Sequence, residues 1–301
     1  MAAAMRCYRH PNRETYISCS ECGRPICTEC MTPAPVGQRC PEHSGKPQGI
    51  ARMKTGVTRA TGRGETGIVT RVLIAINVLI YLTELLQGSG VNAASGSIYV
   101  NGVLVASARE FSGHILPAGL DIGQPIGVAH GDWWRLMTAA FLHYGPIHLG
   151  FNMFFLYWIG TPVEQYLGRA RFLLVYFVSG LAGSAGALVL SPGAVTVGAS
   201  GAIFGILGAA LVLERQRSYV LGGSAMGLIV INLALGFTLS NISIGSHIGG
   251  LLGGAACMLA LSRFGRGHGA YGRVGGIGIA GVVAVAALSV AIAYWKVRGY
   301  A

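Results

Sequence analysis

Charged residues are scarce in this sequence: 22 Lys and Arg and 11 Asp and Glu make up 11% of its 301 residues. A soluble domain carries about 25% charged residues, whereas 52% of the residues here are hydrophobic. Several apolar runs approach or exceed the roughly 20 residues that a membrane-spanning helix needs. The composition therefore predicts an all-α, polytopic membrane protein.

Acidic side chains are absent from the middle of every apolar run. Ion-coupled transporters need ionisable groups within their spans, and a Ser-His-Asp triad or a two-aspartate site needs a carboxylate next to the reacting groups. The sequence also lacks an H-E-x-x-H motif, which excludes the corresponding zinc metalloproteases. Among hydrolytic sites, a Ser–His dyad is what remains.

The net charge of +11 does not indicate a nucleic-acid partner. The Lys and Arg residues are not gathered on one helix but lie mainly in the N-terminal region and in short loops, as the positive-inside bias of membrane proteins requires. The partner predicted by this distribution is the lipid bilayer, with no nucleic acid. The first 66 residues contain no long apolar core, so no cleavable signal peptide is expected.

The chain divides into four parts by composition. We expect a polar metal-binding module, a flexible basic linker rich in Gly, Thr, Lys and Arg, a core of six spans, and a loop with a seventh span: 1–43, 44–67, 68–263 and 264–301. The seven spans are predicted at about 68–87, 148–165, 171–190, 200–213, 219–237, 247–262 and 275–295.

A loop of about 60 residues joins the first two spans, and a loop this long is more often functional than idle. It carries Trp133, Trp134 and Arg135, which suit a membrane interface. Most of the remaining loop arginines fall on the side of the N-terminus, which predicts a cytoplasmic N-terminus. We expect a multi-pass protein of the plasma membrane.

Three predicted spans open on polar residues, which are functional candidates because they are costly inside a membrane. The second span carries His148 and Asn152, the fourth Ser200 and the sixth His247. At 1.5 Å per residue, these groups lie about 20–24 Å from the inner ends of their spans, and thus at one depth. The arrangement favours Ser200 as a nucleophile activated by His247. His148, Asn152 and the Ser200 backbone N–H are the candidate donors to an oxyanion.

Glycines spaced four apart predict that the fourth and sixth spans approach each other closely. These pairs are Gly201 and Gly205, Gly249 and Gly253, and Gly250 and Gly254. Taken singly, a G-x-S-G in a glycine-rich span is more often packing, and a histidine at a span end is more often interfacial. The hypothesis depends on four polar residues converging from three helices.

These motifs resemble those of the rhomboid family over residues 68–263. The residues that carry the resemblance are His148-x-x-x-Asn152, Gly198-x-Ser200-Gly201, His247-x-Gly249-Gly250 and, in the first loop, Trp134-Arg135. The resemblance implies a six-helix rhomboid core, with one extra C-terminal transmembrane helix as a known variation. It also implies an intramembrane serine endopeptidase that cuts transmembrane substrate proteins near the outer face through an acyl-enzyme intermediate.

The resemblance further implies site roles for individual residues. Ser200 and His247 would form the catalytic dyad, and His148, Asn152 and the Ser200 backbone N–H the oxyanion hole. Gly198 of the serine motif would support the site, and Phe204 would stack on the histidine where many relatives have Tyr. Ser246 replaces the usual Ala, and neither departure removes a catalytic group.

Six of the seven cysteines lie in the first 43 residues and form pairs with each other or with histidine. The pairs are Cys7 and His10, Cys19 and Cys22, Cys27 and Cys30, and Cys40 and His43. Eight such ligands fit two tetrahedral zinc sites, and so short a segment needs metal to fold. Disulfides would leave the histidines unexplained. We expect two structural zinc ions and no cofactor for catalysis.

The spacing resembles that of a B-box-type zinc finger. That resemblance implies cross-bracing, in which the first and third pairs share one ion and the second and fourth share the other; sequential pairing stays open. Modules of this kind usually bind protein, which suggests a cytoplasmic protein partner. It also sustains an alternative function, a non-enzymatic membrane scaffold or receptor that recruits partners through this module.

Overall fold

The computed structural model describes most of the chain and divides it into two compact units, Met1–Gly64 and Glu65–Ala301, which are considered separately. The described residues are 5–33, 37–43, 67–88, 95–216, 218–238, 242–263 and 276–300. The predicted linker, apart from its last residue, and the loop after residue 263 lie outside them.

The first unit contains two short antiparallel strand pairs and a core made mainly of cysteine. Strand β1 (Met5–Arg6) pairs with β2 (Glu14–Thr15), and β3 (Thr32–Pro33) pairs with β4 (Gln38–Arg39). Five of its cysteines are buried around Ile26. A core this small supports the expectation that the unit needs metal.

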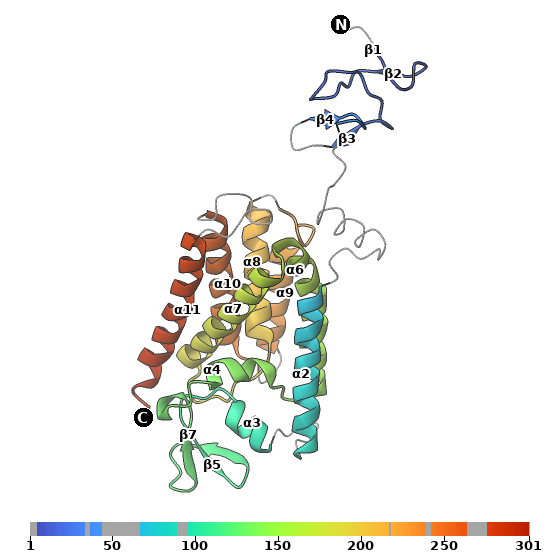
Figure 1. The fold of residues 1–301 in the computed structure, drawn as a ribbon. Coiled ribbons are helices and arrows are strands. Elements are labelled where there is room, and N and C mark those ends of the chain that lie inside the picture. The colour runs from blue at the N-terminus through green and yellow to red at the C-terminus, as the bar shows by residue number, and fades with distance from the viewer. Residues whose placement is uncertain are drawn as a thin grey trace. The chain divides into compact units, whose positions relative to one another are not determined.

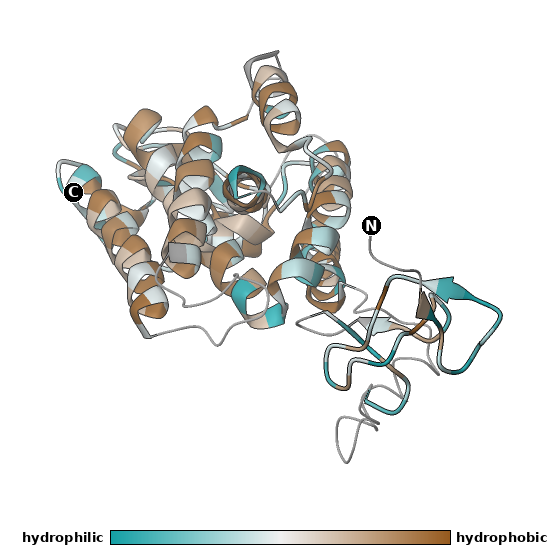
Figure 2. Cartoon of the chain, turned by 90° about the horizontal axis from the view of Figure 1, so that it is seen from above, coloured by the Kyte–Doolittle hydropathy of each residue, from teal (hydrophilic) through white to brown (hydrophobic). Residues whose placement is uncertain are grey.

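The second unit is a helical bundle with an elaborated first loop (Figure 1). Its long helices are α2 (Ile68–Leu86), α7 (Arg169–Leu190), α8 (Ser200–Arg215), α9 (Ala225–Thr238), α10 (Ile244–Arg263) and α11 (Gly276–Val297). A further helical run consists of α5 (Pro146–Phe155), the π-helical η3 (Leu156–Gly160) and α6 (Thr161–Leu167). Figure 2 shows that these helices are mainly hydrophobic.

Four helices are long and apolar enough to cross a membrane, namely Ile68–Leu86, Arg169–Leu190, Ile244–Ser262 and Gly276–Val297. Each coincides with a predicted span. The other three predicted spans also fall on helices, α5 to α6, α8 and α9, of which α9 contains a shorter apolar stretch, Ala225–Ala234. The all-α polytopic fold is therefore confirmed, and the protein is an integral membrane protein.

The largest boundary difference concerns the fifth span, which was predicted from residue 219 but begins as a helix at Ala225. Gly222 and Gly223 adopt positive φ angles of 65° and 83°, which favour glycine and place a turn there instead of helix.

The long first loop has secondary structure of its own. It contains α3 (Ser97–Gly102), α4 (Arg135–Thr138), two 3₁₀ turns, η1 (Val128–His130) and η2 (Ala139–Phe141), and an antiparallel sheet in the order β6 (His114–Pro117), β5 (Ala108–Phe111), β7 (Gln124–Ile126).

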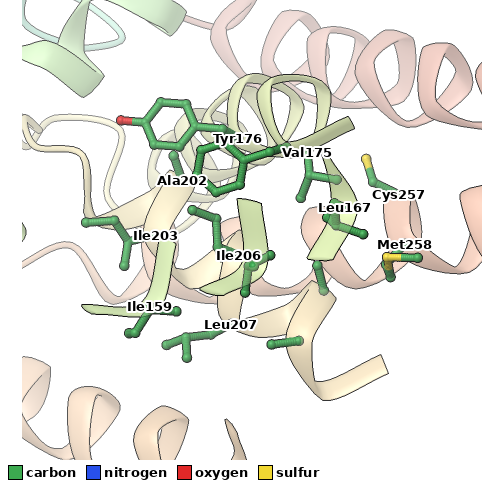
Figure 3. Packing of buried hydrophobic residues seen from close by; sticks show 14 of the residues in the cluster. Ile159, Leu167, Val175, Tyr176, Ala202, Ile203, Ile206, Leu207, Cys257 and Met258 are labelled. Atoms are coloured by element: carbon green, nitrogen blue, oxygen red, sulfur yellow. The ribbon is translucent and has the colours of Figure 1, made fainter. Parts of the chain in front are cut away.

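Side chains from α7, α8 and α10 form the centre of the bundle. Tyr176, Ile206 and Met258 are almost fully buried there, together with neighbouring residues of the same helices and of η3 and α6 (Figure 3). Glycines line the seams between these helices and allow their backbones to approach each other closely. The consequence for the polar residues is described below.

A buried carboxylate ties the start of α2 to the helix α6. Glu164 accepts hydrogen bonds from the backbone N–H groups of Val69 and Thr70, at 2.9 and 2.8 Å, and from the Thr70 hydroxyl at 2.8 Å. The first turn of a helix leaves its N–H groups without partners, and α2 has no cap of its own at Gly67. Glu164 therefore caps a helix that lies more than ninety residues earlier in the sequence.

Candidate active site

Ser200 is the first residue of α8, at the end of the helix where backbone N–H groups are free to donate. Gly198 precedes it with a φ of 118° and donates its N–H to the Ala139 carbonyl at 2.9 Å. A Cβ atom on residue 198 would lie 2.8 Å from Nε2 of His148. Glycine at this position thus allows the turn into α8 and leaves room for the imidazole.

The structure brings Ser200 and His247 together across the α8–α10 seam. The Ser200 Oγ lies 3.0 Å from His247 Nε2, within the range for proton transfer between a nucleophile and its base. Phe204, one turn further along α8, stacks on the imidazole with ring centroids 4.0 Å apart and an angle of 16° between the planes. This is the stacking that the resemblance implied.

The other ring nitrogen of His247, Nδ1, has no hydrogen-bond partner among the described residues. His247 is only 4% exposed, and its Nδ1 makes no hydrogen bond there. The helix α9 passes near that edge of the ring at Gly236, where a Cβ would lie 3.4 Å from Nδ1. The described geometry is that of a pair rather than a triad.

Glycine backbones bring the two helices close enough for this contact. A Cβ on Gly250 of α10 would overlap the carbonyl oxygen of Gly201, and one on Gly254 would overlap that of Gly205. On the opposite side, Gly249 packs in the same way on the carbonyl of Ala182 in α7. The close approach of α8 and α10 predicted from the glycine spacing is confirmed, but the pair Gly249 and Gly253 packs on α7 and not on α8.

The helix α5 brings His148 and Asn152 to the same place. His148 Nδ1 accepts a hydrogen bond from the Tyr144 backbone N–H at 3.4 Å, an arrangement that places the proton of a neutral imidazole on Nε2, the atom beside Gly198. The Asn152 amide donates one N–H to the His148 carbonyl at 2.9 Å, and its nitrogen lies 3.8 Å from the position of a Cβ on Gly198. Both side chains thus have donors near Ser200.

All four polar residues line one cavity of about 380 Å³. Its other walls are mainly apolar and come from α5, α8, α9 and α10 and the segments before α5, α8 and α10. The lining also contains Ser246 of the histidine motif and polar side chains that sequence reasoning missed, namely Tyr144, Thr196, Asn232 and Ser243. An asparagine within an apolar span was a usable signal for Asn232.

A second Ser–His contact occurs in the first loop. Ser107 Oγ lies 2.9 Å from His130 Nε2. This pair is on the surface, neither residue lines the cavity, and neither begins a long helix. It lacks the features that would stabilise a developing oxyanion, so Ser200 and His247 are the better candidate.

The paired cysteines and histidines of the first unit gather into two clusters. Cys7, His10, Cys27 and Cys30 form one, and the second cluster consists of Cys19, Cys22, Cys40 and His43. The ligand atoms of each lie within 4.8 Å of one another. The first pair therefore joins the third, and the second joins the fourth, which is the cross-braced grouping.

The donor geometry fits tetrahedral zinc. With Zn–S bonds of about 2.3 Å, sulfur ligands should lie about 3.8 Å apart, and the sulfurs of Cys22 and Cys40 are separated by 3.9 Å. His10 Nδ1 lies 3.3 Å from the sulfurs of both Cys27 and Cys30. Although burial raises the pKa of Cys7, backbone hydrogen bonds from Cys27, Arg9 and His10 lower it to about 6, which favours the thiolate that binds metal.

Comparison with known proteins places the bundle among its relatives. The rhomboid domain matches residues 130–264, which include every site residue of the cavity but not the metal clusters. The "Rhomboid protease GluP" of Bacillus subtilis (strain 168) is 46% identical over 144 residues, covering 46% of this chain and 28% of the relative. The "Putative rhomboid protease YdcA" of the same organism is 43% identical over 137 residues, covering 44% and 69%.

A longer match is found with "RHOMBOID-like protein 6, mitochondrial" of Arabidopsis thaliana, which is 32% identical over 213 residues, or 63% of this chain and 67% of the relative. The chain thus spans between about a quarter and two thirds of the lengths of these relatives. The matched segments, the helical bundle and the convergence of the polar motifs agree, and this chain belongs to the rhomboid family.

Proposed function

We propose that this chain is an intramembrane serine endopeptidase that cleaves transmembrane proteins. The observation that carries the proposal is the 3.0 Å contact between Ser200 and His247 at the start of α8, inside an apolar cavity. Family membership supports it, and so do the names of two relatives, "Rhomboid protease GluP" and "Putative rhomboid protease YdcA".

In the proposed mechanism, His247 Nε2 takes the proton of the Ser200 hydroxyl as Oγ attacks the scissile carbonyl carbon. The tetrahedral oxyanion is stabilised by the Ser200 backbone N–H, His148 Nε2–H and the Asn152 amide. His247 then gives its proton to the leaving amine as the C–N bond breaks, which leaves an acyl group on Ser200. A water molecule, deprotonated by His247, attacks this ester; the bond between the acyl carbon and Oγ then breaks, the acid product leaves, and His247 returns the proton to Oγ.

The test is cleavage of a reconstituted single-span substrate by purified protein. Ser200→Ala and His247→Ala should each abolish cleavage while leaving the protein folded, and a fluorophosphonate should label the parent but not Ser200→Ala. Ser107→Ala is the matched control, since it removes the surface serine that also contacts a histidine. Cleavage by Ser200→Ala at a tenth of the parent rate would overturn the assignment.

The same test separates the alternative of a non-enzymatic scaffold or receptor. A scaffold would neither be labelled by the fluorophosphonate nor lose function with Ser200→Ala. The oxyanion donors and the stacked Phe204 have no role in a scaffold, so their presence around Ser200 favours the enzyme.

For the first unit, we propose two structural zinc ions with cross-braced ligands. The support is the cluster grouping and the match of the sulfur and nitrogen separations to tetrahedral coordination. Elemental analysis should give two zinc ions per chain, and Cys27→Ser should remove one of them. A cytoplasmic protein is the proposed partner of this unit.

We propose that the N-terminus is cytoplasmic, that the protein lies in the plasma membrane, and that the active site opens to the outer face. The support is the placement of Arg169 and Arg171 in the first turn of α7 and of Arg215 at the last residue of α8, at helix ends on the N-terminal side. Labelling of single cysteines by a membrane-impermeant reagent in intact cells, at residue 1 and at residue 120, tests the orientation. Labelling of residue 1 and not residue 120 would reverse it.

A further inference from the structure

The cavity extends well beyond the Ser200–His247 pair. Its lining follows α8 from Ser200 to Leu207 and α5 from His148 to Phe155, which is seven residues, or about 10 Å, along each helix. This deep part is walled mainly by Phe151, Phe155, Ile203 and Leu207 together with Asn232 of α9. The mechanism proposed above uses none of these side chains.

Asn232 presents an acceptor to this apolar space. Its Nδ2 donates to the Leu228 carbonyl one turn earlier, at 2.8 Å. Asn77 and Asn152 make the same bond to residues 73 and 148, but their Oδ1 atoms are buried and have no partner among the described residues. Asn232 is only partly buried, and its Oδ1 is not among these enclosed atoms. Asn232 itself lines the cavity, so its carboxamide oxygen is available to a molecule there.

A polypeptide cleaved at Ser200 must enter the cavity in an extended form, because a helical backbone hides its carbonyls from attack. Its backbone N–H groups then lose their helical partners, and an unpaired N–H in an apolar environment is unfavourable. An accessible carbonyl oxygen in the same space removes that penalty for one N–H group. Asn232 is the one amide among the cavity-lining residues outside the proposed oxyanion hole.

The depth of Asn232 defines which N–H it reaches. Gly236 lies beside His247, since a Cβ there would be 3.4 Å from Nδ1, and so marks the level of the reacting groups on α9. Asn232 lies one turn deeper, about 6 Å along the helix, and an extended chain covers that depth in about two residues.

We propose that Asn232 is a substrate-binding residue that accepts a hydrogen bond from a backbone N–H of an extended polypeptide, about two residues from the bond that Ser200 attacks. This inference rests on the proposed proteolysis and adds the chemistry of substrate recognition to it. The recognised group is common to every residue except proline, so the contact selects for an unwound backbone rather than for one side chain.

The experiment measures peptide binding without cleavage, in the full chain carrying Ser200→Ala. The probe is a synthetic single-span peptide of leucine and alanine with a central Ala-Ser-Gly-Ala segment. In a set of analogues, an ester replaces each central amide in turn and so removes one N–H. Affinities in detergent micelles are compared between the Ser200→Ala chain and the same chain with Asn232→Leu. Ile231→Leu is the matched control. Ile231 is the neighbour of Asn232 in α9, but its side chain is 58% exposed and does not line the cavity.

Asn232→Leu should weaken binding of the all-amide peptide about fivefold, the effect of one hydrogen bond between neutral groups, and Ile231→Leu should not. When Asn232 is present, one ester analogue should bind about fivefold more weakly than the all-amide peptide. In the Asn232→Leu chain, that analogue and the all-amide peptide should bind equally well. Equal affinity with and without Asn232 would overturn the proposal. An Asn232 effect that survives at every ester position would also overturn it, because a side-chain donor would then be the partner.

Cleavage of the same peptide by the chain with Ser200 intact tests the proteolysis separately. Binding that needs Asn232 without any cleavage would refute the protease and leave the binding role. Cleavage that is indifferent to Asn232, in kcat and in KM, would refute the binding role alone. A peptide that does not bind at all would refute both.

Discussion

Replacing Gly254 with alanine tests whether the glycine seam between α8 and α10 holds the proposed catalytic pair, Ser200 and His247, together. The added methyl group would overlap the carbonyl oxygen of Gly205. Neither group can swing aside, because the methyl is fixed to the backbone of α10 and the carbonyl belongs to the backbone of α8. The helices must separate, at an overpacking cost of about 1–3 kcal/mol. Alanine also gains about 0.8–1.0 kcal/mol of helix propensity. We expect a net loss of up to about 2 kcal/mol.

Gly150 is the matched control for the same substitution. It lies in the helix α5, is exposed, and a Cβ there would meet no atom within 4 Å. Gly150→Ala should therefore show only the gain in helix propensity, up to about 1 kcal/mol. The two variants carry the same chemical change with opposite expected signs, so a general effect of alanine in membrane helices cannot explain the result.

The measurement combines equilibrium unfolding in mixed detergent micelles with turnover of a single-span substrate. Gly254 lies seven residues after His247, so a wider seam also lengthens the Ser200–His247 contact. A misplacement on the order of 1 Å costs about 100-fold in rate, and turnover should fall by more than the stability loss explains. Stability and turnover of Gly254→Ala equal to those of Gly150→Ala would refute the reasoning.

Three further results are expected. Glu164→Ala should destabilise the bundle by about 3–5 kcal/mol, because it leaves buried N–H groups of α2 unpaired. Glu214→Ala is the control and should cost far less, because it loses one 3.3 Å hydrogen bond from the Ala225 N–H. Equilibrium unfolding in detergent measures both variants. Asn152→Ala should lower kcat by about 100-fold or more with a smaller change in KM, and unchanged turnover would remove it from the oxyanion hole. Deleting residues 1–50, or adding a chelator that unfolds the first unit, should leave in vitro cleavage nearly intact; its complete loss in well-folded protein would join the unit to the catalytic machinery.

The positions of the polar residues could be predicted from the sequence because a membrane makes them conspicuous. Ser200 and His247 stand out against apolar neighbours, and helix geometry alone placed them at one depth. The glycine spacing indicated which helices approach. The described structure adds the 3.0 Å contact between Ser200 and His247 itself. This contact depends on the close backbone approach that Gly250 and Gly254 allow, which the depth of the two residues in the membrane does not predict.

Other features could not be predicted, each for a physical reason. The sheet β5–β7 consists of strands of three or four residues, too short to show an alternating pattern. Glu164 sits at the end of a span, where a charged residue usually faces the interface, and nothing in sequence reveals its partner near residue 69. Asn232 carries a visible signal, a polar group in an apolar run, but its importance depends on the cavity.

The pair geometry explains how a histidine can be oriented without a carboxylate. A charged group beside His247 would have to be desolvated within the membrane, at a cost of several kcal/mol per ion. Instead, Phe204 covers one face of the ring, an aromatic contact worth about 0.5–1.5 kcal/mol, and α9 passes the Nδ1 edge at Gly236, where a Cβ would lie 3.4 Å from that nitrogen. Packing thus confines the imidazole to the orientation in which Nε2 faces Ser200. Since the confinement comes from α8 and α9 rather than from a third ionisable group, the proposed chemistry depends directly on how these helices pack around the cavity.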